Sequence, residues 1–230
     1  MYVLPKTLRS ENRLLASLPR ADYLALEPHL EAVALPIREV LGQAGKRMSH
    51  AYFPASGVIS LVHYVAEGTG AEVAMIGREG YLGVAEMLGG SNAPTESMVQ
   101  IGGQAWRINA TKLRQIAFER PTVLRPLLRY AQALYIQASV AAACNARHLL
   151  PQRLARWLLV ASDRSGLSEL PLRHEFLSYM LGVRRAGVTD ALSTLKANGL
   201  VDTARGHIAL LSRPRLEAAA CTCYRAVADE

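Results

Sequence analysis

The chain has 230 residues, half of them hydrophobic, and a formal net charge of +7 with a pI of about 9.6. This length suits one large domain or two modest ones with a sizeable core. No run of about 18 uncharged apolar residues occurs and the N-terminus MYVLPKTLRSENRLL has no apolar signal-peptide core, which argues against a membrane span or secretion. We therefore expect a cytoplasmic protein with no membrane partner, and the positive charge favours a polyanion as partner.

The first 108 residues change character near Leu35. Residues 7–34 have helical apolar spacing, interrupted at Pro19, and predict short helices. From Leu35 to Ile108, short β-type runs alternate with glycine turns, as in HAYFPASGVISLVHYVAEGTGAEVAMIGREG. Several short strands at near-regular spacing predict a β-sandwich or barrel.

A long helix is predicted from about Pro121 to Arg147, after a shorter one that Asn109 caps. Its apolar stripe recurs at alternating steps of four and three, which is the spacing of a coiled-coil seam. The same stripe could pack the helix on its own domain, but its length favours a dimer seam. The seam residues are Leu127, Ala131, Leu134, Ala138, Ala141 and Asn145.

Pro151 suits the first turn of a further helix, PQRLARWLLVASDR. A hinge at residues 147–150 is therefore expected between two domains. We predict a sensor domain with the long helix at 1–148 and a second domain at 149–230.

The segment HEFLSYMLGVRRAGVTDAL, residues 174–192, has the pattern of a helix-turn-helix. Leu177, Leu181 and Val188 are apolar at spacings that pack two short helices together, and Gly182 stands where the turn needs positive φ. The second helix opens with two arginines that can reach phosphates and base edges in a major groove. The alternative is a helical hairpin with a solvated basic face.

The segment LVDTARGHIALL, residues 200–211, follows and has the pattern of a β-hairpin. A helix-turn-helix followed by a hairpin is a winged helix, and the tip residues suit a phosphate contact. The expected DNA-binding residues are Arg184, Arg185, Ala186, Thr189, Asp190, Arg205 and His207.

The three cysteines are Cys144, Cys221 and Cys223, an odd number that argues against a disulfide framework. Cys221 and Cys223 could be metal ligands or a redox pair. Since a zinc or iron–sulfur site usually needs four ligands and no second cysteine pair exists, we expect reduced thiols, no metal and no cofactor.

The chain as a whole resembles the Crp/Fnr family of bacterial transcription regulators. The resemblance rests on YFPASGVISLV, GREGYLGVAEMLGG, CNARHLLPQRLARWLL and LSYMLGVRRAGVTDALSTLKANGLV. It implies an α+β fold with an N-terminal β-roll of the cyclic-nucleotide-binding type, a long dimerisation helix and a C-terminal winged helix-turn-helix. It also implies a homodimer on a palindromic operator in double-stranded DNA, with RNA polymerase as a further partner. CNARH and ACTCY resemble a subgroup whose effectors are largely undefined.

The chain departs from the family in the effector pocket. In the family a glutamate binds the ribose and an arginine binds the phosphate, but the resemblance places Val84 and Glu96 at these positions, and no arginine occurs from Glu79 to Ala105. A carboxylate repels a phosphate. The N-terminal cysteine cluster of the oxygen-sensing branch is absent as well. The pocket residues implied are Gly83, Val84, Ala85, Glu86, Glu96 and Ser97.

The recognition helix departs too, because the best-known members have an Arg-Glu pair followed four residues later by arginine. Here the series is Arg185, Ala186 and Asp190. Arg185 can bind guanine O6 and N7, Ala186 can touch a thymine methyl, and Asp190 can accept from cytosine N4. We therefore expect a different half-site.

The resulting hypothesis is a non-enzymatic, dimeric, sequence-specific transcription regulator, controlled allosterically by an unidentified small molecule rather than cyclic AMP in the usual mode. One alternative is an effector-independent DNA-binding dimer whose β-roll is only structural. A remote alternative is a cupin-like metal enzyme, for which His50, His63 and Glu72 would be the ligands.

Overall fold

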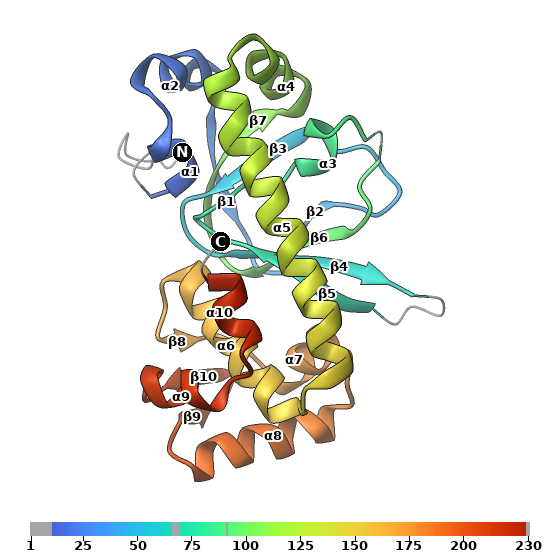
Figure 1. The fold of residues 1–230 in the computed structure, drawn as a ribbon, viewed down its shortest axis with the longest axis vertical. Coiled ribbons are helices and arrows are strands. Elements are labelled where there is room, and N and C mark those ends of the chain that lie inside the picture. The colour runs from blue at the N-terminus through green and yellow to red at the C-terminus, as the bar shows by residue number, and fades with distance from the viewer. Residues whose placement is uncertain (1–10, 66–69, 91, 229–230) are drawn as a thin grey trace. The chain divides into compact units, whose positions relative to one another are not determined.

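The computed structural model describes residues 11–65, 70–90 and 92–228. Its elements have the predicted α+β order, with strands concentrated in the first half, a long central helix, and a helical second half with a small sheet (Figure 1). Within the described ranges, no helix has both the length and the apolar character that a membrane span requires. Residues 7–10 of the predicted helical segment lie outside these ranges.

The described strands of the β-roll form two sheets, one of order β1-β7-β3 and one of order β2-β6-β4-β5. Side chains that alternate between the inside and outside of the sheets form the core, as in the buried Ala51 and Phe53 of β3. The strands are β1 (Glu31–Leu35), β2 (Val40–Gly42), β3 (His50–Pro54), β4 (Val58–Tyr64), β5 (Gly70–Ile76), β6 (Glu96–Ile101) and β7 (Gly103–Asn109).

The helical prediction is wrong for residues 31–34, because they belong to strand β1 (Glu31–Leu35). The segment pairs antiparallel with β7, where Glu31 lies opposite Arg107 and their side chains form a 2.6 Å ion pair. These two residues are 76 positions apart in the chain, and pairing with so distant a strand overrides the local helical spacing. Helices do precede β1, namely α1 (Arg13–Ser17) and α2 (Arg20–Leu26), followed by a 3₁₀ turn at Glu27–His29.

Three helices complete the first half. The short α3 (Val84–Met87) lies between β5 and β6 in the chain. The predicted cap of α4 (Ala110–Glu119) is present, because Asn109 Oδ1 accepts a 3.1 Å hydrogen bond from the Lys112 backbone N–H. The long helix α5 spans Pro121–Arg147, as predicted, and continues through Pro126.

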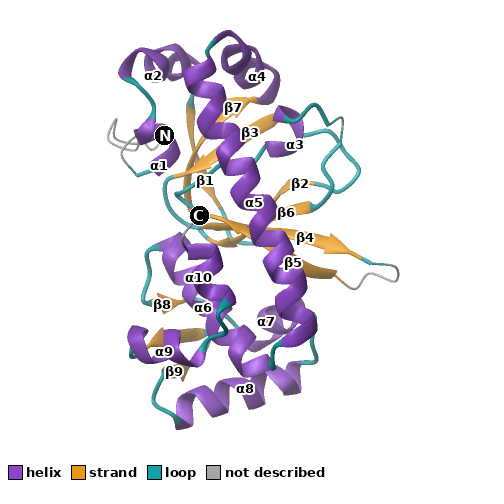
Figure 2. Cartoon of the chain, viewed as in Figure 1, coloured by secondary structure: helices purple, strands orange, loops and turns teal. Residues whose placement is uncertain are grey.

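The second half is a helical assembly around a three-stranded sheet of order β8-β10-β9 (Figure 2). Helix α6 (Leu150–Ser165) carries its proline in the first turn and ends at Gly166. The other elements are α7 (His174–Leu181), α8 (Arg185–Ala197), α9 (Arg213–Ala219), α10 (Cys223–Ala228), β8 (Glu169–Leu170), β9 (Val201–Ala204) and β10 (His207–Leu210).

The chain divides into two compact units, and each is described by itself. The first comprises Met1–Leu61 and Ile76–Leu134, and the second comprises Val62–Met75 and Tyr135–Glu230. This division falls within α5 rather than at residues 148 and 149. The boundary predicted between residues 148 and 149 refers to independently folding domains, and it remains a prediction.

In the first unit, Tyr130 of α5 packs on a glycine. A Cβ atom at Gly80 would lie 1.9 Å from the Tyr130 ring, and that ring also packs against Tyr81 with centroids 5.6 Å apart. Tyr130 is buried, and its hydroxyl lies 3.4 Å from Glu79 Oε1. Only glycine allows this contact between the helix and the loop after β5.

Gly80→Ala should therefore destabilise the protein by about 1–3 kcal/mol, because the added methyl group must displace a packed ring. Urea denaturation of the two proteins measures the change. Gly102→Ala is the matched control, because its added Cβ would meet only atoms at 3.4 Å or more. Equal midpoints for the two variants would contradict the packing argument.

Candidate nucleic-acid interface

Helices α7 and α8 form the predicted helix-turn-helix. Gly182 adopts φ +63° directly after α7, which is the left-handed conformation that the tight turn needs. The facing side chains Leu177, Leu181, Val188 and Ala191 are all buried. The two helices are thus held by an apolar core, as the sequence predicts.

The opposite face of α8 is exposed at its N-terminal end. Arg184 is the N-cap residue, and Arg185 begins the helix. Thr189 Oγ1 donates to the Arg185 carbonyl oxygen at 3.2 Å and lies 3.1 Å from His174 Nδ1, which ties the start of α7 to the recognition helix. The outward-facing residues are the predicted ones, Arg184, Arg185, Ala186, Thr189 and Asp190.

The hairpin of β9 and β10 forms the wing, with Ala204 opposite His207. Arg205 and Gly206 make the turn, and both Arg205 and His207 are exposed. His207 Nδ1 lies 3.4 Å from Glu169 Oε1 on the adjoining strand β8, an ion pair when the imidazole is protonated. The wing therefore presents one permanent cation and one histidine to solvent.

An open groove of about 580 Å³ lies between the helix-turn-helix and the wing. Three arginines and one histidine line it, against one glutamate, Glu175. Arg173 is exposed, and its Nε lies within 4.0 Å of the position that a Cβ atom on Gly206 would occupy. A cationic groove of this kind suits the phosphates of a nucleic-acid backbone. The cationic residues are Arg173, His174, Arg185 and Arg205.

Sequence reasoning missed Arg173 and His174. The available signal was the pair of basic residues immediately before Glu175 in PLRHEF. The first helix of a helix-turn-helix crosses the DNA backbone, so residues at the start of this helix can reach the phosphates.

The residues expected in an effector pocket lie around α3 and at the start of β6. Gly83 is the N-cap of α3, and Val84 and Ala85 are half-buried. Glu86 is buried, and its Oε1 accepts a 3.2 Å hydrogen bond from the Met48 backbone N–H. Glu96 begins β6 and is half-buried, while Ser97 is buried. Two acidic side chains, Glu86 and Glu96, are thus among the six expected pocket residues.

The predicted seam residues of α5 differ in their exposure. Leu127 and Ala141 are buried within their own chain, whereas Asn145 is exposed and the other three are half-buried. A second stripe at the same alternating spacing is more accessible: Tyr135 is 73 % and Leu128 40 % exposed. This accessible stripe consists of Leu124, Leu128, Ala131, Tyr135, Ala138, Ala142 and Asn145.

The residues of the cupin-like alternative do not form a metal site. Among the described residues, the only group of metal-binding side chains does not include His50, His63 or Glu72. Glu72 is buried and accepts a 2.8 Å hydrogen bond from Trp157 Nε1. The ligand set of the cupin-like alternative is therefore not assembled among the residues that the structure describes.

The geometry defines a class of protein in which a β-roll and a long helix precede a winged helix-turn-helix. Family models agree, since residues 32–120 match the cyclic nucleotide-binding domain and residues 152–219 match the Crp-like helix-turn-helix domain. No curated protein matches the sequence.

Solved structures have the same fold. FixK2 from Bradyrhizobium japonicum is similar with a TM-score of 0.72 and 17 % identity, covering 84 % of this chain and 98 % of that one. The c-di-GMP-responsive regulator CLP of Xanthomonas campestris has a TM-score of 0.69 and 15 % identity over 84 % and 100 % of the two chains. A CRP/FNR-family regulator of Thermus thermophilus has a TM-score of 0.67 and 20 % identity over 83 % and 98 % of the two chains. The chain belongs to the Crp/Fnr family of DNA-binding transcription regulators.

Arg173→Ala should weaken binding to any duplex, because Arg173 is expected to neutralise a phosphate rather than read a base. The slope of log affinity against log salt should fall by about one for each copy of Arg173 that contacts a phosphate. Fluorescence anisotropy on a random-sequence duplex at several salt concentrations measures both changes. Arg20→Ala, which removes an exposed arginine in the first unit, should leave affinity and slope unaltered. If the two variants behave alike, Arg173 does not contact DNA.

Proposed function

We propose that this regulator binds DNA as a homodimer, with one α8 helix in each of two successive major grooves. The observation that carries the proposal is the exposed N-terminal end of α8, which presents two arginines and three shorter side chains beside a cationic wing. In a dimer, two such ends can meet half-sites one helical turn apart, so the operator would share the two-fold symmetry of the protein.

Specificity would come from three positions on α8. Arg185 can donate two hydrogen bonds to guanine, Ala186 can contact a thymine methyl, and the Asp190 carboxylate can accept from cytosine N4. Arg173, Arg184 and Arg205 would bind phosphates and fix the register. Because alanine replaces the family's usual glutamate at position 186, the preferred half-site should differ from that of the best-known members.

The accessible stripe of α5 is the face that we propose for the dimer. It offers apolar side chains at coiled-coil spacing along one helix, and small alanines allow close approach of a second copy. Leu127 and Ala141 of the predicted seam are already covered by their own chain, which shifts the proposed contact to Leu128 and Tyr135.

Control by an unidentified small molecule would act through the β-roll and α5 on the spacing of the two α8 helices. The alternative is a dimer that binds DNA without an effector. A small molecule that raises the melting temperature of the purified protein would support control by an effector. CLP, which has the same fold, is a c-di-GMP-responsive regulator, so ligands other than cyclic AMP are compatible with this architecture.

Arg185→Ala should cost about 1–3 kcal/mol on the preferred duplex and relax the preference at one base pair. Arg205→Ala should weaken preferred and random duplexes by the same factor, because the wing is expected to contact phosphates. Competition binding with the two duplexes distinguishes the two roles. If Arg185→Ala also loses affinity equally on both duplexes, Arg185 does not read a base.

Tyr135→Asp should convert the dimer to monomers, since an unpaired carboxylate is costly in an apolar interface. Sedimentation equilibrium measures the mass in solution, which should fall to that of a single chain. The affinity for a duplex with two half-sites should fall as well. Phe118→Asp is the matched control, because Phe118 is an exposed aromatic residue of α4. A stable Tyr135→Asp dimer would place the interface elsewhere.

Cyclic AMP should not bind in the family's usual pocket. With Val84 and Glu96 at the two positions, the chain lacks the glutamate that binds the ribose and the arginine that binds the phosphate. Loss of these two charge-assisted contacts, each worth about 1.5–3 kcal/mol, lowers affinity for cyclic AMP by roughly two to four orders of magnitude. Isothermal titration up to millimolar ligand tests this, and the double variant Val84→Glu, Glu96→Arg should gain affinity. Micromolar binding by the unaltered protein would refute the electrostatic argument.

A further inference from the structure

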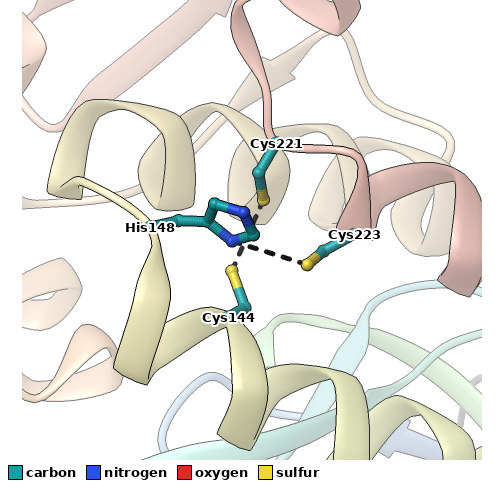
Figure 3. A group of neighbouring side chains, drawn as sticks. All are labelled: Cys144, His148, Cys221 and Cys223. Atoms are coloured by element: carbon teal, nitrogen blue, oxygen red, sulfur yellow. Dashed lines mark hydrogen bonds between the residues drawn. The ribbon is translucent and has the colours of Figure 1, made fainter.

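Four metal-binding side chains from distant parts of the sequence converge in the second unit. Cys144 lies in the last turn of α5 and His148 follows one turn later, where its backbone N–H donates to the Cys144 carbonyl oxygen at 3.0 Å. Cys221 precedes α10, and Cys223 is its first residue. Figure 3 shows the three sulfurs and the imidazole ring pointing toward a common centre.

The distances between the donor atoms suit one ion. Cys144 Sγ lies 3.4 Å from Cys221 Sγ, and Cys223 Sγ lies 3.6 Å from His148 Nδ1. All four donor atoms lie within 4.8 Å of one another. Tetrahedral Zn²⁺ with bonds of about 2.3 Å to sulfur and 2.0–2.1 Å to nitrogen separates its ligand atoms by about 3.5–3.8 Å. Small side-chain adjustments would bring the cluster to that geometry.

We propose that Cys144, His148, Cys221 and Cys223 bind one Zn²⁺ ion as a closed structural site. Three thiolates and an imidazole are a ligand set that proteins use for structural zinc. All four positions are filled by protein, so the ion would have no open position for a substrate. Each thiol releases one proton when it binds the metal.

Two other uses of the same residues fit the geometry less well. An iron–sulfur cluster holds its ligands farther apart, because several irons and bridging sulfides stand between them. A disulfide between Cys144 and Cys221 would leave Cys223 and His148 without a reason to converge, and all three cysteines are free. A single ion accounts for all four side chains.

The surroundings support a negatively charged complex. Zn²⁺ with three thiolates carries a net charge of −1. Two arginines of α6 interact electrostatically with the cysteines: Arg153 interacts with Cys144 and Cys221, and Arg156 interacts with Cys223. Arg156 is buried, and its Nε has no hydrogen-bond partner among the described residues. Favourable charges around the first ligands strengthen metal binding.

A second contact holds the same C-terminal segment in place. The Tyr224 hydroxyl donates a 2.8 Å hydrogen bond to Asp163 Oδ2 of α6, and Arg213 binds the same carboxylate. Cys221 and Cys223 therefore stand on a segment that is already fixed to α6. The ion would in addition join this segment to the end of α5, 77 residues earlier in the chain.

The test is the zinc content of the full-length protein, purified under reducing conditions from zinc-replete cells. Inductively coupled plasma mass spectrometry should find about one zinc per chain. Replacement by Co²⁺ should give the visible absorption bands of a tetrahedral ion and the near-ultraviolet charge-transfer bands of thiolate ligands. Neither readout depends on DNA, so failure here would leave the proposed function intact.

Variants assign the ligands. Mutation of a residue that only hydrogen-bonds to a metal ligand lowers metal affinity about 10–100-fold. Loss of a ligand itself should cost at least as much, so we expect at least this decrease in His148→Gln and in Cys223→Ser. His148→Cys should retain zinc, because it restores a fourth ligand. His29→Gln, at an exposed histidine outside the cluster, is the matched control and should bind zinc like the unaltered protein.

Three results would overturn the proposal. The first is reduced, folded protein that retains no zinc and gives no cobalt bands. The second is full zinc content in both His148→Gln and Cys223→Ser. The third is stoichiometric iron and sulfide in the purified protein, which would assign the cysteines to a cluster.

Discussion

Nine consecutive residues of α6, Leu154–Ser162, are buried, so this helix must be covered on every side. Helices α8, α9 and α10 supply much of the cover. Full burial of each large apolar side chain on α6 contributes about 1.5–3 kcal/mol. The polar atoms on α6 also need partners, which explains why Arg153 donates to the Leu181 carbonyl oxygen at 2.7 Å and why Trp157 donates to the buried Glu72.

The orientation of α8 follows from this burial. Val188, Leu192 and Leu195 face the core, and a helix that buries this stripe must turn the start of its opposite face outward. Arg185 and Asp190 lie on that outward face. The surface that we propose to read DNA is therefore a consequence of packing on α6, and the short wing adds charge beside it.

The sequence was sufficient for elements whose signals are local. The helix-turn-helix, its Gly182 turn, the hairpin and the Asn109 cap each depend on a few neighbouring residues, and the structure contains all of them. It was not sufficient where distant segments meet. Strand β1 needs its distant partner β7, and Cys144 and His148 meet Cys221 and Cys223 only in the folded chain. On α5, two apolar stripes have the same spacing, and only the structure shows that Leu127 faces its own chain while Tyr135 is exposed.

The central claim is that two copies of α8 read a two-fold symmetric DNA site. Selection of bound duplexes from a random-sequence library by the purified protein tests it most directly. We expect one enriched motif made of two inverted half-sites, with centres about 10 base pairs apart and a guanine in each for Arg185. An enriched single asymmetric half-site, or no enrichment at all, would contradict it.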